Sequence, residues 1–208
     1  MENQESFKVV FVGGAGTGAK TSLINYIIGV PFKECIESTG APSYAQFIRS
    51  TSLGKIRINL WDTIGQEKYI HLNKMFYKNA DCFIIGFDIT SKSSFNSIEY
   101  FYNGIKSNMD NNPLFYLVGN KSDLFMNREI KEEEAMDYAK EKNIKYFEVS
   151  AKQGSNVEEL MNDVTNSLIQ KYKDENKQDI LNRIIIENKE NKENKKNKEN
   201  KKKKCLIF

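Results

Sequence analysis

Short apolar runs along the chain alternate with longer segments in which apolar residues recur every three or four positions. The short runs are rich in β-branched and aromatic residues and are bounded by glycine or polar turns, so each predicts a buried strand. They occupy Phe7–Val12, Tyr44–Thr51, Ile56–Trp61, Cys82–Asp88, Leu114–Val118 and Lys145–Glu148. The segments with helical spacing are Thr21–Ile28, Ser93–Asn108, Lys131–Lys142 and Val157–Tyr172.

This order of elements predicts an α/β domain. Strands that alternate with helices favour parallel pairing through right-handed crossovers. The turn Ser52-Leu53-Gly54-Lys55 is typical of a hairpin, so one strand pairs antiparallel. We expect three layers: a six-stranded, mostly parallel sheet with one antiparallel strand, and helices on both faces. Ligands bind such sheets at the carboxyl ends of the strands.

A glycine-rich turn follows the first strand and resembles a P-loop. Its small residues allow backbone N–H groups to surround phosphate oxygens, Lys20 would reach the β and γ phosphates, and the Thr21 hydroxyl would ligate Mg²⁺. Ala19 stands where the pattern has glycine, either as its replacement or because one residue is inserted after Gly18. We expect strain if Ala19 adopts a positive φ. The phosphate-binding candidates are Gly14, Ala15, Gly16, Thr17, Gly18, Ala19, Lys20, Thr21 and Ser22.

A second motif, Asp62-Thr63-Ile64-Gly65-Gln66-Glu67, follows another predicted strand. Asp62 would hold Mg²⁺ through water, and the N–H of Gly65 would face the γ-phosphate. Gln66 would orient the attacking water, which makes Gln66 and Lys20 the catalytic candidates. Thr39 is the candidate for a second Mg²⁺ ligand that engages only when a γ-phosphate is present, which would make its segment a switch.

Base recognition is predicted at Asn120-Lys121-Ser122-Asp123. The Asp123 carboxylate would accept from N1–H and the 2-amino group of guanine, a donor pair that adenine lacks. Asn120 would tie the loops together, the Ala151 N–H would donate to guanine O6, and Phe32 would pack edgewise against the base. The guanine and ribose candidates are Phe32, Asn120, Lys121, Asp123, Ser150, Ala151 and Lys152.

Charge divides the chain into two parts. From Lys173 to the end there are 12 basic and 7 acidic side chains, whereas residues 1–172 hold 19 and 21. The sequence therefore favours residues 1–6 as an extension, 7–172 as the domain and 173–208 as a disordered tail rich in Lys, Asn and Glu. A nearly neutral domain does not favour nucleic acid as a partner. Three cysteines without paired spacing, and no leader at the N-terminus, favour a cytoplasmic setting.

The chain ends in Cys205-Leu206-Ile207-Phe208, which fits a C-a-a-X box and favours geranylgeranylation of Cys205. One lipid anchors weakly, and Lys201–Lys204 would add a second signal on an anionic cytoplasmic leaflet, worth ~1 kcal/mol per lysine. We therefore expect reversible attachment of a cytoplasmic protein to the membrane surface.

Together these motifs resemble the Ras superfamily of small GTPases, over residues 7–172 and the lipidation end. Rab-type proteins are most similar, because they share the sequence motifs Trp61-Asp62-Thr63, Phe76-Tyr77-Lys78-Asn79-Ala80 and Phe87-Asp88-Ile89-Thr90. The resemblance implies a P-loop GTPase domain, a monomer that cycles between GTP and GDP with Mg²⁺ and acts as a switch in vesicle traffic. It also implies an exchange factor, an activating protein, a dissociation inhibitor and effectors as partners. Because the active-site motifs contain no arginine, intrinsic hydrolysis would be slow.

Three departures from the family pattern keep alternatives open. They are Ala19, the switch residues Gly40 and Pro42, and Ile64 in place of a small residue before Gly65. They leave room for a scaffold that binds nucleotide without useful hydrolysis. The single C-a-a-X cysteine, where many Rab proteins carry two, leaves room for a Ras-type or Rho-type signalling protein.

Overall fold

A single six-stranded sheet organises the molecule. The computed structural model describes residues 6–14, 19–34, 41–51, 54–65, 76–109 and 112–174. Within them the strands lie in the order β2-β3-β1-β4-β5-β6. Only the β2/β3 pair is antiparallel, and every other neighbouring pair is parallel, which confirms the expected mixed sheet. Their bounds are β1 Ser6–Val12, β2 Ser43–Thr51, β3 Gly54–Asp62, β4 Cys82–Asp88, β5 Leu114–Asn120 and β6 Lys145–Glu148.

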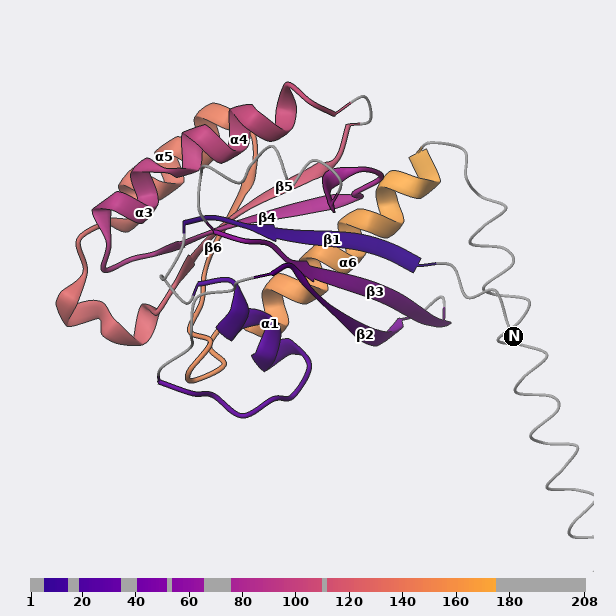
Figure 1. Ribbon diagram of the computed structural model, residues 1–208, viewed down its shortest axis with the longest axis horizontal. Coiled ribbons are helices and arrows are strands. Elements are labelled where there is room, and N and C mark those ends of the chain that lie inside the picture. Colours follow the sequence, from indigo (N-terminus) through magenta and orange to yellow (C-terminus); the bar gives the residue numbers. More distant parts are fainter. Residues whose placement is uncertain are drawn as a thin grey trace, which may run out of the picture.

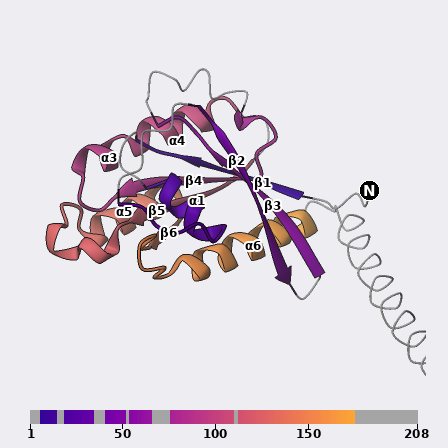
Figure 2. The same ribbon diagram turned by 60° about the horizontal axis from the view of Figure 1, so that its bottom comes forward.

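Helices cover both faces of this sheet, as expected. Helices α1 and α6 lie on one face and α3, α4 and α5 on the other (Figures 1 and 2). Alternation along β1 explains the two cores, since Val9 and Phe11 pack toward α1 and α6 whereas Val10 and Val12 pack toward α4 and α5. The bounds are α1 Thr21–Ile27, α3 Lys92–Asn96, α4 Ile98–Lys106, α5 Glu132–Lys142 and α6 Val157–Asp174. Among the described residues, none of the helices has the length and apolarity that crossing a bilayer requires.

The helix expected over Ser93–Asn108 is two helices, so that prediction was wrong in detail. Ser97 ends α3 and precedes α4, and its hydroxyl donates to the Ser94 carbonyl at 2.8 Å. Serine side chains compete for backbone hydrogen bonds and so favour helix ends. The break orients α4 separately, which lets Ile98, Phe101 and Ile105 all face the sheet.

A 3₁₀ segment, η2 at Ser122–Asn127, was not expected from the sequence. It begins directly after Lys121, whose φ of 69° turns the chain away from β5. Leu124, Phe125 and Met126 are exposed on it, so no amphipathic period marks it as a helix. Its position at the carboxyl end of β5 brings it beside the loop that follows β6.

Candidate functional site

The turn after β1 depends on a glycine at position 13. Gly13 has a φ of +141°, and a Cβ placed on it would lie 2.1 Å from the carbonyl oxygen of Gly86 in β4. Only glycine permits so close an approach of two backbones. The Lys20 ammonium then reaches back and donates to the carbonyl oxygens of Gly13 and Gly14, each at 2.9 Å. The lysine is therefore fixed beneath the loop that would receive phosphate.

Lys20 is buried, with 5% of its surface exposed. Burial lowers the pKa of its ammonium, and the nearby Asp62 carboxylate partly opposes that shift. A positive charge held away from water interacts more strongly with an anionic ligand than an exposed one does. Lys20 thus has the position and the environment expected of a phosphate-binding lysine.

Ala19 is not strained. The described residues other than glycine that have positive φ are Asn79, Lys121, Asn143 and Asn156. The side chain of Ala19 is buried, and its Cβ would lie 3.6 Å from a Cβ built on Gly86, an ordinary contact distance. The condition for strain at Ala19, a positive φ, is therefore not met. Residues 15–18, including the candidates Ala15, Gly16, Thr17 and Gly18, lie outside the described residues.

The two described magnesium candidates are adjacent. The Thr21 hydroxyl donates to Asp62 Oδ2 at 2.5 Å, although 41 positions separate them. The pair arises because Phe11 near the end of β1 is in register with Asp62 of β3, and the Thr63 hydroxyl adds a 2.7 Å bond to the Phe11 carbonyl. A hydroxyl and a carboxylate are the hard oxygen ligands that Mg²⁺ prefers, so the donor set fits this ion. Gly65 lies just beyond and is buried.

Asn120 joins three segments. Its side-chain nitrogen donates to the Ala19 carbonyl and to the Ser22 hydroxyl, both at 3.3 Å. Its Oδ1 accepts from the backbone nitrogens of Lys121 at 2.8 Å and Ala151 at 3.0 Å. One buried amide thus connects the loop predicted to bind phosphate with both loops predicted to hold the base.

The other residues predicted to recognise the base form a second set of contacts. The Ser150 hydroxyl donates to Asp123 Oδ1 at 2.6 Å and accepts from the Gln153 backbone nitrogen at 3.0 Å. The Lys121 ammonium lies 2.6 Å from Asp88 Oδ2. These contacts hold the carboxylate of Asp123 and the stem of Lys121 on the same edge of the sheet.

Phe32 and Lys152 approach one another at the rim of the candidate site. The Lys152 ammonium lies 5.9 Å from the centre of the Phe32 ring and 3.5 Å from Glu34 Oε1. Phe32 is 41% exposed, so it is not a core aromatic residue. Thr39, Gln66, Cys205 and Lys201–Lys204 lie outside the described residues.

The protein-family comparison decides the assignment. The model of the Ras family matches residues 8–170. The chain belongs to the Ras family. Its relatives include Rab-7a of Paramecium octaurelia, 33% identical over 181 residues that cover 84% of this chain and 86% of the relative. RABF2b of Arabidopsis thaliana is 35% identical over 162 residues (77% and 80%), and human Rab-30 is 32% identical over 166 residues (78% and 80%).

Within this Ras-family fold, three supporting residues were not assigned roles from the sequence. Asp88 accepts from the backbone and hydroxyl of Thr90 through Oδ1 while Oδ2 faces Lys121. Arg128 binds Glu148 through two hydrogen bonds of 2.8 and 2.5 Å. The place of Asp88 at the end of a strand could have indicated a role for it, whereas no sequence pattern predicts that Arg128 binds Glu148.

Proposed function

We propose that the chain is a Rab-type small GTPase, a switch that binds GTP and GDP and hydrolyses GTP slowly. The observation that carries the proposal is the Asn120 side chain, which connects Ala19 and Ser22 of the phosphate loop with Ala151 of the base loop. A single ligand that has a guanine at one end and phosphates at the other would contact all of these loops at once.

The geometry of the described side chains supports the roles of Lys20, Thr21, Asp62 and Asp123, whereas those of Thr39 and Gln66 rest on the sequence motifs. Lys20 would bind the β and γ phosphates, and Asp123 would accept from the two guanine donors. Thr21 and Asp62, with Thr39, would hold Mg²⁺, and this ion would neutralise charge on the phosphates. Gln66 would orient the attacking water, and Gly65 would donate its N–H to the γ-phosphate.

A partly exposed aromatic cluster supports a partner surface of the Rab type. Tyr44, Trp61 and Phe76 come from β2, β3 and the segment before β4, with ring centres 5.2 and 5.8 Å apart between successive pairs. Tyr44 is 52% exposed although it is large and partly apolar. Aromatic residues of this kind are enriched at protein interfaces. We propose that effectors in vesicle traffic bind here, where β2 leads out of the Thr39 segment.

Membrane attachment belongs to the same proposal. Prenylation of Cys205 and the charge of Lys201–Lys204 would attach the protein reversibly to an anionic cytoplasmic surface. Exchange factor, activating protein and dissociation inhibitor would then govern the cycle of a monomer.

The test is to purify the full chain in Mg²⁺, identify the nucleotide that copurifies, and measure single-turnover hydrolysis of loaded GTP. We expect bound guanine nucleotide and slow turnover that Gln66→Leu abolishes. Preference for ATP would contradict the proposed base recognition.

The second candidate is a binding scaffold without useful hydrolysis, which the half-buried Ile64 beside Gly65 favours. A branched side chain there would displace Gln66. Ile64→Ala distinguishes the two candidates. A clear gain in the single-turnover rate would mean that Ile64 slows GTP hydrolysis, and an unchanged rate would mean that it does not.

A further inference from the structure

The charged residue Arg49 is buried although it lies on an edge strand. It belongs to β2, and 9% of its surface is exposed. Ala45 and Phe47, four and two positions earlier, pack against the core beneath α1 and α6, so alternation along the strand places Arg49 on the face toward α6. A guanidinium stays charged, and burying it costs free energy unless acceptors surround it. None of the roles proposed above uses Arg49.

The acceptors of Arg49 come from two successive turns of α6. Its guanidinium donates to both carboxylate oxygens of Glu158 and to Oδ1 of Asn162. Glu158 and Asn162 are four positions apart, so they lie on one face of the helix. The Glu158 side chain is 76% exposed, so water weakens the attraction between the two charges. The buried guanidinium still needs these acceptors, and the contact therefore fixes the beginning of α6 against β2.

The β6–α6 loop, residues 149–156, is continuous with the first turn of this helix. The backbone nitrogen of Gly154 donates to the Ser150 carbonyl at 2.7 Å. The backbone nitrogen of Val157, where α6 begins, donates in turn to the Gly154 carbonyl at 3.3 Å. Because these bonds run from Ser150 into the helix, the loop and the first turn form one unit. A contact that fixes Glu158 therefore also fixes the loop.

This loop orients the carboxylate that we propose for base recognition. The Ser150 hydroxyl donates to Asp123 Oδ1 at 2.6 Å, so a displaced loop would turn the carboxylate away from its proposed guanine donors. Asn120 holds the loop on one side by accepting from the Ala151 backbone nitrogen at 3.0 Å. Arg49 holds the same loop from β2, through the first turn of α6.

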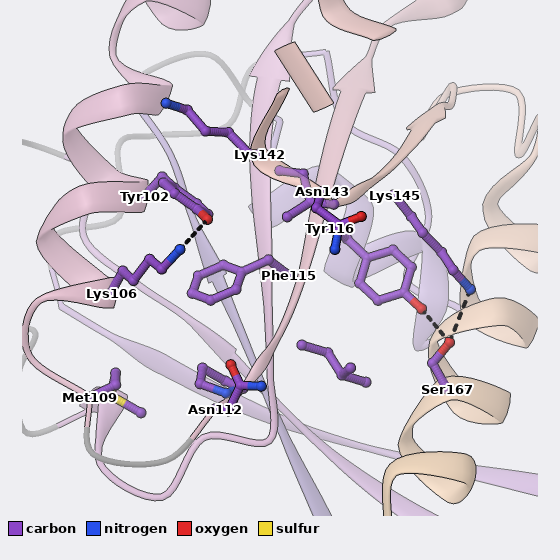
Figure 3. A pocket seen from close by; sticks show the side chains of 13 residues that line it. Tyr102, Lys106, Met109, Asn112, Phe115, Tyr116, Lys142, Asn143, Lys145 and Ser167 are labelled. Carbon is purple, nitrogen blue, oxygen red and sulfur yellow. Dashed lines mark hydrogen bonds between the residues drawn. The ribbon is translucent and has the colours of Figure 1, made fainter. Parts of the chain in front are cut away.

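The middle of α6 has a separate anchor. The Tyr116 hydroxyl of β5 donates to Asp163 Oδ1 at 2.6 Å and lies 2.9 Å from Ser167 Oγ. The Lys145 ammonium of β6 donates to the same serine oxygen at 3.2 Å (Figure 3). These contacts hold the helix on the sheet beyond its first turn. They therefore offer a comparison for Arg49, since they support α6 without tying its beginning to the edge strand.

We propose that Arg49 is a positioning residue for base recognition. Through Glu158 and Asn162 it holds the β6–α6 loop where Ser150 orients Asp123 toward guanine. The inference rests on the proposed function, because it takes Asp123 as the acceptor for the base. It brings into the nucleotide site a residue of β2, a strand that carries none of the nucleotide-binding motifs.

The first test measures how fast a fluorescent GDP analogue leaves the full chain in Mg²⁺. Dissociation should be about tenfold faster in Arg49→Met, which corresponds to about 1.4 kcal/mol. It should be about fivefold faster in Glu158→Ala, which leaves the bond to Asn162 in place. The double variant should be no faster than Arg49→Met alone, because both changes remove one contact. Glu158 lies on the surface, so Glu158→Ala provides the test if Arg49→Met does not fold.

The second test separates positioning from support of the fold. Inosine diphosphate (IDP) lacks the 2-amino group that Asp123 would accept from, so the unaltered chain should prefer GDP to IDP. Competition between the two should show this preference reduced about fivefold in Arg49→Met and in Glu158→Ala, because the carboxylate loses its orientation. Ser167→Ala removes a contact of the other anchor and should leave the preference unchanged. Glu159→Ala removes an equal charge at an exposed site in the same turn and should change neither readout.

Three results would overturn the inference. They are dissociation as slow as in the unaltered chain, faster dissociation with an unchanged preference for GDP over IDP, and equal changes in Glu159→Ala. The second would mean that Arg49 supports the fold alone. If the unaltered chain itself does not prefer GDP to IDP, Asp123 is not the acceptor for the base. The proposed recognition then fails together with this inference, so the unaltered chain distinguishes the two failures.

Discussion

Asn120 donates to the backbone carbonyl of Ala19 across 3.3 Å, although the two residues are 101 positions apart. This bond, with those to Ser22 and Ala151, makes the loops proposed to bind phosphate and base mutually dependent. Asn120→Ala should therefore release GDP about 10 to 100 times faster, because buried partners lose hydrogen bonds worth about 1–3 kcal/mol. Dissociation of a fluorescent GDP analogue measures this. Asn108→Ala, which removes an exposed amide, should leave the rate unchanged, and equal rates for both variants would contradict the argument.

Asp123 should decide which base binds. Its Oδ1 accepts from the Ser150 hydroxyl at 2.6 Å, which orients the carboxylate. In Asp123→Asn the side chain gains a donor, so it should favour xanthine, which has a carbonyl where guanine has its 2-amino group. We expect GTP affinity to fall by about 100-fold or more and XTP affinity to exceed it. Competition between the two nucleotides measures the change, and retention of the GTP preference would remove Asp123 from base recognition.

Gly13 and Gly86 offer a matched pair of substitutions at one backbone contact. Gly13→Ala should destabilise the fold by about 2–4 kcal/mol, since its Cβ would overlap the Gly86 carbonyl and its φ is +141°. Gly86→Ala should cost less than about 1 kcal/mol, because its Cβ would meet Ala19 only at an ordinary 3.6 Å. Urea unfolding of the nucleotide-free proteins compares them. Equal losses would mean that the close approach at Gly13 is not the cause.

The Glu148–Arg128 pair should make part of the free energy of unfolding dependent on pH. Burial alone would raise the pKa of Glu148, but hydrogen bonds from Arg128 and Tyr146 lower it below its ordinary value of 4.5. A lowered folded-state pKa means that the contribution is present above pH 4.5 and is lost as the pH falls through the folded-state pKa. Glu148→Gln should thus cost about 1–2 kcal/mol at pH 7 and progressively less below pH 4.5. Thermal unfolding across that range measures the difference, with the exposed Glu133→Gln as a control that should follow the parent at every pH.

The strands and the order of the site motifs were accessible from the sequence because each depends on local pattern. Buried strands such as Cys82–Asp88 are short apolar runs, and Asn120 and Asp62 end strands that pattern alone identifies. The break at Ser97 was not accessible, because the apolar spacing continues across it while the serine hydroxyl ends the first helix. The φ of Ala19 was also not predictable from the sequence, since it depends on how the loop packs against Gly86.

The place of β2 in the sheet has a consequence for how such proteins diversify. β2 lies at the edge and pairs with β3 alone, whereas β1, β4 and β5 carry the loops that would hold the nucleotide. Substitutions on the outward side of β2, at Tyr44 or Ile48, alter an exposed surface without disturbing the parallel strands. A domain of this kind can therefore acquire new partners while the residues proposed to bind the nucleotide stay unchanged. Proteins that bind different partners can thus descend from one ancestral domain.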